Sequence, residues 1–353
     1  WQEEYQAGNK PSGLALKKTF NAMKMSDFPW VYEVTKYACQ QPFIHLQSAF
    51  NRFFKKQGRY PTFKKKGVHD SFYIGNDHIQ IKGQRLRLPK LGWVKLKEVL
   101  RFSGKVVSAT ISRVAERWFV SIHIELNQCP TPCQSGTAVG IDLGIKRLAT
   151  CSDGTVFDSV KPLAKHLKKL KRLQRRLSKK QKGSNNRMKA RMKVAKQHYR
   201  IRCLRQDGLH KLTTYLTSHY KKIVIEDLNV SGMMKNHHLA KAISDMGFYE
   251  FRRQLGYKSA LHGNDLVIAD RFFPSSKTCS RCKKVKSDLT LAERVFHCDY
   301  CGLDMGRDQN AAINLLEYTA SSAEFKACGE EGTGITQISD VKPASMKQEL
   351  EYV

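Results

Sequence analysis

The sequence predicts a multidomain α/β protein with a helical start, a small β-rich domain and a larger α/β domain that carries a cysteine-bearing insertion. Three observations lead to this fold class. The chain has 353 residues, which suggests two or three domains. Short alternating segments rich in β-forming residues fill residues 70–127, and apolar runs alternate with helical periodicities after residue 137. Four of the ten cysteines form two closely spaced pairs within residues 279–301.

The charge of the chain narrows the classes of partner. Lysine and arginine total 62 against 31 acidic residues, a formal net charge of +31. Such a chain repels itself unless a polyanion neutralises it, so nucleic acid is the first candidate and an anionic membrane surface the second. No stretch approaches 18 apolar residues, which excludes a transmembrane helix. Ten cysteines are too few for a disulfide scaffold, and their pairing suggests metal in a reducing compartment.

The first 136 residues change character once. Residues 1–69 are expected to be helical, because apolar side chains recur at helical spacing until the turn residues 58–61. Residues 70–136 are expected to form a small antiparallel barrel or sheet followed by a linker at Pro130-Thr131-Pro132. Gly and Pro punctuate its short strands, which is typical of such domains.

The larger domain is expected to begin at residue 137 with a strand over 138–141. Further strands are expected at 147–151, 156–157, 222–226 and 265–269. Between them, residues 161–217 predict a helical hairpin with one apolar stripe and a break at Gly183-Ser184-Asn185-Asn186.

This hairpin is strongly basic. Residues 161–205 contain 19 Lys or Arg and no acidic residue. A run of charge is usually a solvated face, but here only an external anion can offset the repulsion. The candidate phosphate contacts are Lys168, Lys169, Arg172, Arg175, Arg176, Arg187 and Arg191.

The cysteine pairs have the spacing of a zinc site. Cys279-x2-Cys282 and Cys298-x2-Cys301 are separated by fifteen residues, and two such knuckles place four thiolates around one ion. The competing interpretations are two unrelated pairs or redox thiols, which the specific spacing disfavours. His297 is not expected to be a ligand, because four cysteines already complete a tetrahedron.

Three carboxylates sit where apolar segments end or helices begin. Asp142 and Glu226 follow apolar strands, and Asp308 opens an expected helix. Each has a structural interpretation: Asp142 could end a strand in a turn, and Asp308 could be a helix N-cap. Converging carboxylates are also what a two-Mg²⁺ site needs, because hard cations take oxygen ligands and clamp a phosphodiester.

A strand followed by Asp-x-Gly also opens the phosphate-binding fold of sugar kinases and actin-like ATPases. That fold requires a second glycine-rich nucleotide loop downstream, which this sequence does not contain. It also leaves the basic hairpin and the four cysteines without a role.

Several motifs in order point to a known family. They are Gly140-Ile141-Asp142-Leu143-Gly144, Ile225-Glu226-Asp227-Leu228-Asn229, Phe273-Pro274-Ser275-Ser276-Lys277-Thr278-Cys279, Cys298-x2-Cys301-Gly302 and Arg307-Asp308-x-Asn310-Ala311-Ala312-x-Asn314. Together they resemble TnpB, a family of transposon-encoded nucleases related to the type V CRISPR effectors. The resemblance covers nearly all of residues 60–320, and that of residues 1–60 is weaker.

The resemblance implies a fold in more detail. It is an RNase H-like RuvC nuclease domain with an inserted zinc finger, a β-barrel wedge domain and a helical recognition lobe. The expected boundaries are 1–69 for the recognition region, 70–136 for the wedge domain and linker, 137–278 and 302–320 for the RuvC domain, 279–301 for the zinc finger, and 321–353 for a disordered tail.

The resemblance also implies a function, an RNA-guided DNA endonuclease that cleaves target DNA beside a short flanking motif. Asp142, Glu226 and Asp308 match the catalytic carboxylates that hold two Mg²⁺ ions, and the four cysteines match the ligands of one structural Zn²⁺. Lys64 and Lys66 lie where the family contacts nucleic acid near that motif. The implied partners are a guide RNA from the transposon end and double-stranded target DNA. The protein is expected to be a monomer within this ribonucleoprotein and not to bind a membrane. The implied location is the cytoplasm and nucleoid of a prokaryote.

Two departures and two alternatives accompany this interpretation. Many members carry an acidic residue where this chain has Gly306, and the family's first wedge strand is not visible, so a natural N-terminal segment is expected before Trp1. One alternative is an RNA-guided DNA-binding protein without nuclease activity, which the three carboxylates disfavour. The other is a conventional RNase H-like DNA transposase, which would need no guide RNA.

Overall fold

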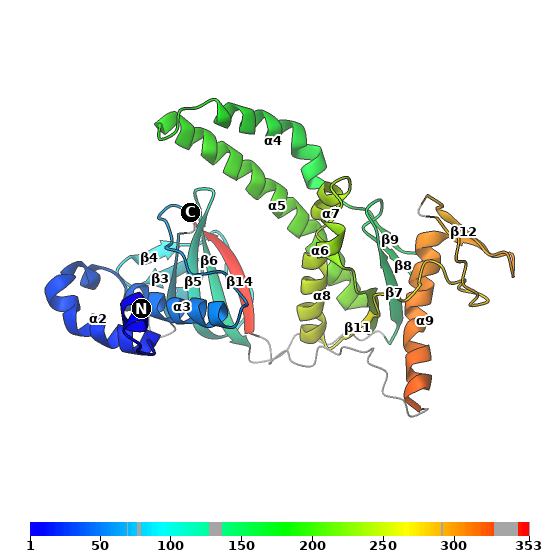
Figure 1. The fold of residues 1–353 in the computed structure, drawn as a ribbon, viewed down its shortest axis with the longest axis horizontal. Helices are drawn as coiled ribbons and strands as arrows, with labels where there is room; N and C mark the ends of the chain where they lie inside the picture. Colours follow the sequence, from blue (N-terminus) through cyan, green and yellow to red (C-terminus); the bar gives the residue numbers. More distant parts are fainter. Residues whose placement is uncertain (69, 76–78, 127–135, 291, 328–344, 353) are drawn as a thin grey trace. The chain divides into compact units, whose positions relative to one another are not determined.

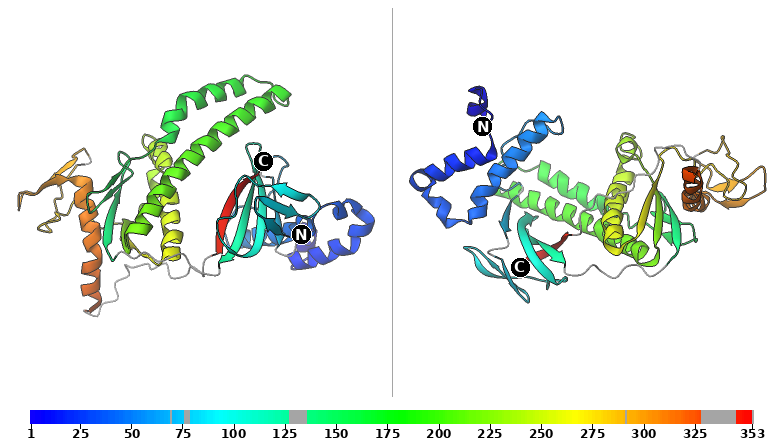
Figure 2. Two further views of the ribbon diagram at one scale, coloured as in Figure 1. Left: turned by 180° about the vertical axis from the view of Figure 1, so that it is seen from behind. Right: turned by 90° about the horizontal axis from the view of Figure 1, so that it is seen from below.

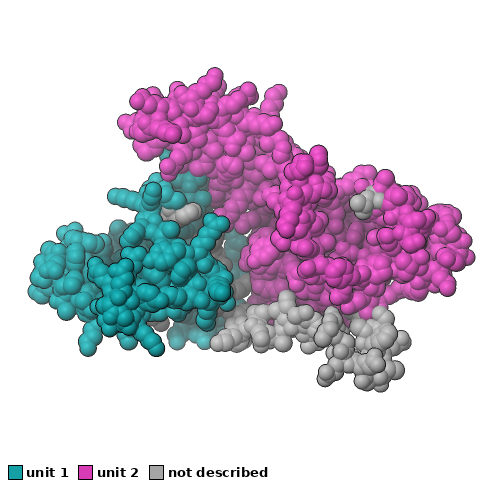
Figure 3. All heavy atoms as spheres, viewed as in Figure 1, with its two compact units in different colours: residues 1–127, 345–353 teal, residues 128–344 magenta. Residues whose placement is uncertain are grey.

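The computed structural model describes residues 1–68, 70–75, 79–126, 136–290, 292–327 and 345–352 (Figure 1). The chain divides into two compact units (Figure 3). The first contains Trp1–Asn127 and Ser345–Val353, and the second contains Gln128–Ala344. Within the described ranges, no helix is both long and apolar enough to cross a membrane. The expected linker at Pro130-Thr131-Pro132 falls outside the described residues.

The first unit begins with the helices that the periodicity predicts. They are α1 (Gln2–Gln6), α2 (Gly13–Asp27), the 3-10 helix η1 (Pro29–Glu33) and α3 (Lys36–Phe54). Local sequence explains the starts of α2 and α3, because the side chains of Ser12 and Thr35 each accept a hydrogen bond from a backbone N–H three residues on. Helical structure over most of residues 1–54 is therefore confirmed.

The β-rich part of the first unit contains two antiparallel sheets over one core. Ile74, Leu86 and Ile122 are buried together in that core. One sheet has the order β1-β5-β6-β14 and the other the order β2-β3-β4, so of the expected antiparallel barrel or sheet the described strands form antiparallel sheets. The strands are β1 (Ser71–Gly75), β2 (Gln80–Lys82), β3 (Arg85–Leu88), β4 (Gly92–Lys95), β5 (Gly104–Val114), β6 (Arg117–Leu126) and β14 (Ser345–Tyr352).

The C-terminal part of the chain differs from the expectation of a disordered tail over 321–353. Helix α9 (Arg307–Ala327) continues past residue 320. Strand β14 pairs antiparallel with β6, from Ser345 opposite Glu125 to Tyr352 opposite Trp118. The expectation is therefore wrong for residues 321–327 and 345–352. The physical reason is that β6 has an edge with unpaired N–H and C=O groups, which a strand distant in sequence satisfies.

The second unit is built on a mixed five-stranded sheet with the order β11-β10-β7-β8-β9. Its strands are β7 (Ala138–Leu143), β8 (Ala149–Cys151), β9 (Val156–Phe157), β10 (Lys222–Glu226) and β11 (Asp265–Ala269). Strands β7, β10 and β11 are parallel, whereas β8 runs antiparallel to both of its neighbours. All five occur where the sequence predicts strands.

Helices cover both faces of this sheet (Figure 2). One face packs on α5 (Asn185–His219), α7 (Ala240–Met246) and α8 (Phe248–His262), with Ile141, Ile225 and Phe251 fully buried between them. The other face packs on α9, where Val224, Ala269 and Leu315 are buried together. The short helix α6 (Val230–Met233) follows β10.

The basic hairpin consists of α4 (Pro162–Ser178) and the first part of α5 (Figure 1). The predicted break is confirmed at Gly183 and Ser184, the N-cap of α5, whereas Asn185 and Asn186 are the first residues of α5. Asp245 of α7 anchors the hairpin, because its carboxylate accepts hydrogen bonds of 2.9 and 3.0 Å from the backbone N–H groups of Leu163 and Ala164. Arg205 lies 3.1 Å from the same carboxylate.

The cysteine segment lies between β11 and α9. It contains a two-stranded hairpin of β12 (Val295–His297) and β13 (Asp304–Gly306). This hairpin continues past Cys301 to Gly306, which pairs with Val295, so the cysteine-bearing fold extends beyond the expected boundary at residue 301. Gly306 is thus a strand residue directly before α9.

Candidate active site and metal centre

Asp142 and Glu226 lie at the same level on adjacent parallel strands. Ile141 of β7 stands opposite Ile225 of β10, so the two carboxylates occupy the next position on each strand. Neighbouring strands lie about 4.8 Å apart, and residues at equal register in a parallel pair face the same side. Because Ile141 and Ile225 point into the core beneath α5 and α8, Asp142 and Glu226 face the opposite side of the sheet.

Helix α9 covers that opposite face and brings Asp308 to it. The approach is close at Gly140, where a Cβ atom would lie 2.0 Å from the carbonyl oxygen of Ala312 and 2.4 Å from the N atom of Leu316. Asp308 is the second residue of α9, one turn before Ala312.

The charges of Glu226 and Asp308 both act on Asp142, so the three carboxyl groups lie within electrostatic range of one another. Burial, followed by the charges of Glu226 and Asp308, raises the pKa of Asp142 to about 8, and Arg307 acts in the opposite direction. Like charges that share a site disfavour ionisation, and a cation between them reverses this effect. Within the described ranges, the oxygen atoms of the three carboxylates do not all lie within 4.8 Å of one another, as the sulfur atoms of the four cysteines do. Their oxygen donors and excess negative charge fit Mg²⁺.

The neighbour of Glu226 has the opposite environment. Asp227 accepts hydrogen bonds from the guanidinium groups of Arg252 on α8 and Arg271 after β11. Burial disfavours its ionisation, but these two arginines outweigh it and lower the pKa of Asp227 below its ordinary value. Asp227 is therefore committed to ion pairs, and Glu226 is the carboxylate on this strand end that remains for other cations.

The structure adds two residues that sequence reasoning did not single out. The buried hydroxyl of Ser275 donates a hydrogen bond to Oε1 of Glu226. Asn314 of α9 donates to the carbonyl oxygens of Ser275 and Thr278 at 2.8 and 2.6 Å. Both belong to the family motifs, but only the fold shows what they contact. The unusual placement of amides on an apolar helix face was the one available signal.

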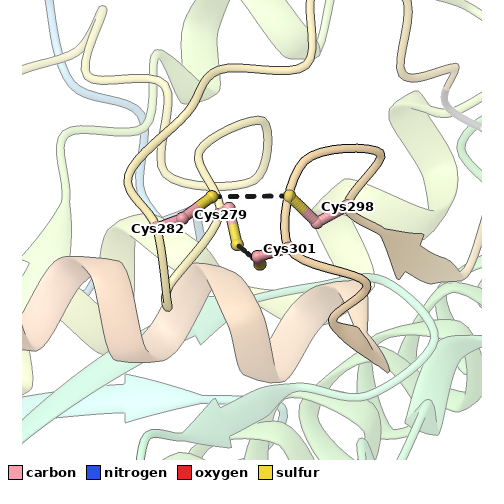
Figure 4. A group of neighbouring side chains, drawn as sticks. All are labelled: Cys279, Cys282, Cys298 and Cys301. Atoms are coloured by element: carbon pink, nitrogen blue, oxygen red, sulfur yellow. Dashed lines mark hydrogen bonds between the residues drawn. The ribbon is translucent and has the colours of Figure 1, made fainter.

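The four cysteines gather at one point (Figure 4). Their sulfur atoms all lie within 4.8 Å of one another, with 3.6 Å between Cys279 and Cys301 and 3.5 Å between Cys282 and Cys298. A tetrahedron with Zn–S distances of about 2.3 Å has S–S distances of roughly 3.8 Å, so this set fits a zinc ion. His297 lies outside the set and contacts Asp304 at 2.7 Å, as expected for a residue that is not a ligand.

The thiol of Cys298 ionises more readily than an ordinary cysteine. Burial opposes the charge on Cys298, but hydrogen bonds from the backbone N–H groups of Cys301 and Tyr300 outweigh it and lower its pKa to about 6. A thiolate is the form that binds metal, so this backbone geometry favours coordination over a neutral thiol pair.

The basic side chains of the hairpin are mostly exposed. Lys168, Lys169, Arg172, Arg175, Arg176 and Arg191 have exposed side chains. Arg187 differs, because its guanidinium donates to the carbonyl oxygens of Leu177 and Lys180 at 3.1 and 2.8 Å. It closes the end of α4, a contact that holds the hairpin turn.

Lys64 and Lys66 belong to the first unit. They are exposed in the segment between α3 and β1. Among the described residues, neither lysine forms an ion pair with an acidic side chain. Both ammonium groups are therefore compatible with a phosphate contact.

Comparison with known families identifies two matching regions. The family described as "Probable transposase" (OrfB_IS605) matches residues 121–237. The family described as "Cas12f1-like, TNB domain" matches residues 248–315, which include α8, the cysteine segment and the first part of α9. A solved Cas12f1–sgRNA–target DNA complex aligns with a TM-score of 0.49 and 15% identity over 78% of this chain and 69% of that chain.

Curated relatives match over most of the chain. "Putative RNA-guided DNA endonuclease InsQ" of Escherichia coli K12 is 35% identical over 347 residues, covering 93% of this chain and 85% of the relative. A "Putative RNA-guided DNA endonuclease" of Streptomyces pristinaespiralis is 40% identical, covering 92% of this chain and 81% of the relative. "TnpB-like protein L79" of Acanthamoeba polyphaga mimivirus is 26% identical over 59% of this chain. The chain belongs to the TnpB family of transposon-encoded proteins, which includes the bacterial relatives named RNA-guided DNA endonucleases.

Proposed function

We propose that this protein is a transposon-encoded, RNA-guided DNA endonuclease whose reaction takes place at Asp142, Glu226 and Asp308. The observation that carries this proposal is the register of β7 and β10, which puts Asp142 and Glu226 side by side on the face covered by the start of α9. The names of the bacterial relatives support the same activity. The mixed sheet with helices on both faces supports an RNase H-like RuvC domain.

Two Mg²⁺ ions bound here would polarise the scissile phosphate and stabilise the attacking and leaving oxygens. Asp142 would hold both ions, because the charges of both Glu226 and Asp308 act on it. Glu226 and Asp308 would each complete one side of the site. Asp142 must lose its proton to act, so ion binding has to overcome a pKa of about 8.

Nucleic acid partners follow from the charge distribution. The exposed cations of α4 and α5 would bind the phosphates of a guide RNA or its duplex with target DNA. Lys64 and Lys66 would contact the duplex near the flanking motif. In this proposal, base pairing reads the sequence, and the protein acts as a monomer within a ribonucleoprotein in the bacterial cytoplasm.

The remaining domain assignments are part of the same proposal. Residues 1–69 would be the recognition region, 70–136 the wedge domain, and 137–278 with 302–320 the RuvC domain. One structural Zn²⁺ at the four cysteines would hold the finger, whose described residues form a small core of Leu289, Phe296 and Leu303 with Met305 packed against it.

The experiment that tests guided recognition is purification of the protein from cells that also carry the transposon end. Bound RNA is then sequenced. The proposal predicts one discrete RNA that ends in a variable guide. Random RNA fragments, or none, would contradict guided recognition and favour a conventional DNA transposase.

A further inference from the structure

Ser275 occupies a buried position beside Glu226. Its side chain is 3% exposed, and its hydroxyl donates to Oε1 of the carboxylate. Hydrogen bonds to a carboxylate are stronger than those between neutral groups and fix its orientation. Ser275 therefore determines which oxygen of Glu226 is directed away from the loop and is available to an ion.

Two buried asparagines of α9 hold the loop that carries Ser275. Asn314, which is 2% exposed, donates to the carbonyl oxygens of Ser275 and Thr278. Asn310, which is fully buried, donates to the carbonyl oxygen of Thr278 at 2.7 Å and accepts from the N–H of Ser280 at 2.9 Å. Buried amides of this kind lose their partners only at considerable cost, so they fix the path of the loop.

The same loop leads directly into the cysteine cluster. Ser280 lies between Cys279 and Cys282, so only four residues separate the amide that contacts Asn310 from the serine whose hydroxyl contacts Glu226. Asp308 lies in the first turn of the helix that carries both asparagines. The cluster, the loop and two of the three carboxylates are thus held by one helix.

We propose that Ser275 is a positioning residue for Glu226, and that Asn310 and Asn314 transmit the folded state of the first cysteine knuckle to it. This inference rests on the proposed function, because it takes Glu226 as a ligand of the divalent ion. Zinc in the knuckle would then act beyond the stability of the finger. It would determine how tightly the carboxylate site binds Mg²⁺.

The first test is a Mg²⁺ titration of the zinc-loaded protein. Two quantities are measured at each Mg²⁺ concentration: the melting temperature of the protein and DNA cleavage by its complex with guide RNA. Ser275→Ala should raise the half-saturating Mg²⁺ concentration about tenfold, the effect of one lost bond to a charged group. Ser275→Thr, which keeps a hydroxyl, should restore it. Ser287→Ala is the matched control, because Ser287 is an exposed serine of the same segment. Zinc content is measured for every variant to show that the knuckle is intact.

The second test removes zinc with a chelator that does not bind Mg²⁺. Zinc removal should weaken the Mg²⁺ response of the unmodified protein but add little in Ser275→Ala, because both changes act through one path. Equal effects in both proteins, or a Ser275→Ala variant that matches the unmodified protein, would overturn the inference alone. The proposed function requires that the unmodified protein responds to Mg²⁺ and that Asp142→Asn abolishes this response. If either result is not obtained, the proposed function fails as well.

Discussion

Asp142 and Glu226 occupy equivalent positions on two adjacent parallel strands, one residue beyond the paired Ile141 and Ile225. Eighty-three residues of chain separate them, including the whole basic hairpin. Parallel pairing places their side chains on one face, where the first turn of α9 adds Asp308. A concentration of negative charge has thus been assembled in a protein that is otherwise strongly basic.

The first prediction concerns stability and pH at Asp142. Its folded-state pKa of about 8 lies above the ordinary value of 3.8, so the folded state binds more protons between these values. Stability therefore falls as pH rises through this window. Asp142→Asn should raise the melting temperature at pH 8 without divalent ions, and Mg²⁺ should stabilise only the unmodified protein. Asp265→Asn, at the opposite end of the sheet, is the control. A lower melting temperature for Asp142→Asn at pH 8 would contradict this account.

A second prediction tests the approach of α9 to β7. Gly140→Ala places a Cβ atom against the backbone of α9, so helix and strand must separate. We expect a loss of at least about 2 kcal/mol in the free energy of unfolding, measured by urea denaturation. Gly256→Ala in α8 meets no atom within 4 Å and should stabilise by about 0.5–1 kcal/mol. Equal stability of the two variants would show that the close approach is unimportant.

The third prediction concerns zinc. The purified protein should contain one zinc ion per chain, and Cys298→Ser should lose it, because the substitution removes one of the four sulfur ligands. His297→Ala should retain zinc, since His297 contacts Asp304 instead. Atomic absorption measures both. Loss of zinc from His297→Ala with retention in Cys298→Ser would refute the four-cysteine site.

A fourth prediction concerns the hairpin. Replacing Lys168, Arg172 and Arg175 with Gln should reduce RNA affinity and lower the salt dependence of binding by about 0.7 to 0.9 in log–log slope per lost phosphate contact. Lys211→Gln is the control, because Lys211 already pairs with Asp207 at 2.8 Å. Filter binding at several salt concentrations measures the slopes. An unchanged slope in the triple variant would mean that the hairpin does not bind phosphate.

Local patterns in the sequence predicted the elements well. The apolar runs of β7, β10 and β11, the break at Gly183 and the four cysteines are all local signals, and each has its counterpart in the structure. Contacts between distant segments leave no such signal. The pairing of β14 with β6, and the contacts of Asn314 and Ser275, depend on which surfaces meet after folding.

The sequence also offered three candidate carboxylates without showing how they are arranged. Asp227 and Glu226 are adjacent in sequence and chemically alike, yet two arginines neutralise Asp227 while Ser275 contacts Glu226. This difference comes from α8 and the loop after β11, which lie far along the chain. Composition and spacing cannot distinguish the two residues. The alternation of side chains between the two faces of the sheet along β10 can, because it assigns Glu226 to one face.

The central claim is that Asp142, Glu226 and Asp308 cut DNA under the direction of an RNA. The most direct measurement is cleavage of a matched double-stranded target by the protein–RNA complex in Mg²⁺, with and without Asp142→Asn. The account predicts cleavage by the unmodified protein and by Asp265→Asn. It predicts no cleavage by Asp142→Asn, which should still bind the target. Cleavage that persists in Asp142→Asn, or no Mg²⁺-dependent cleavage by the unmodified protein, would contradict it.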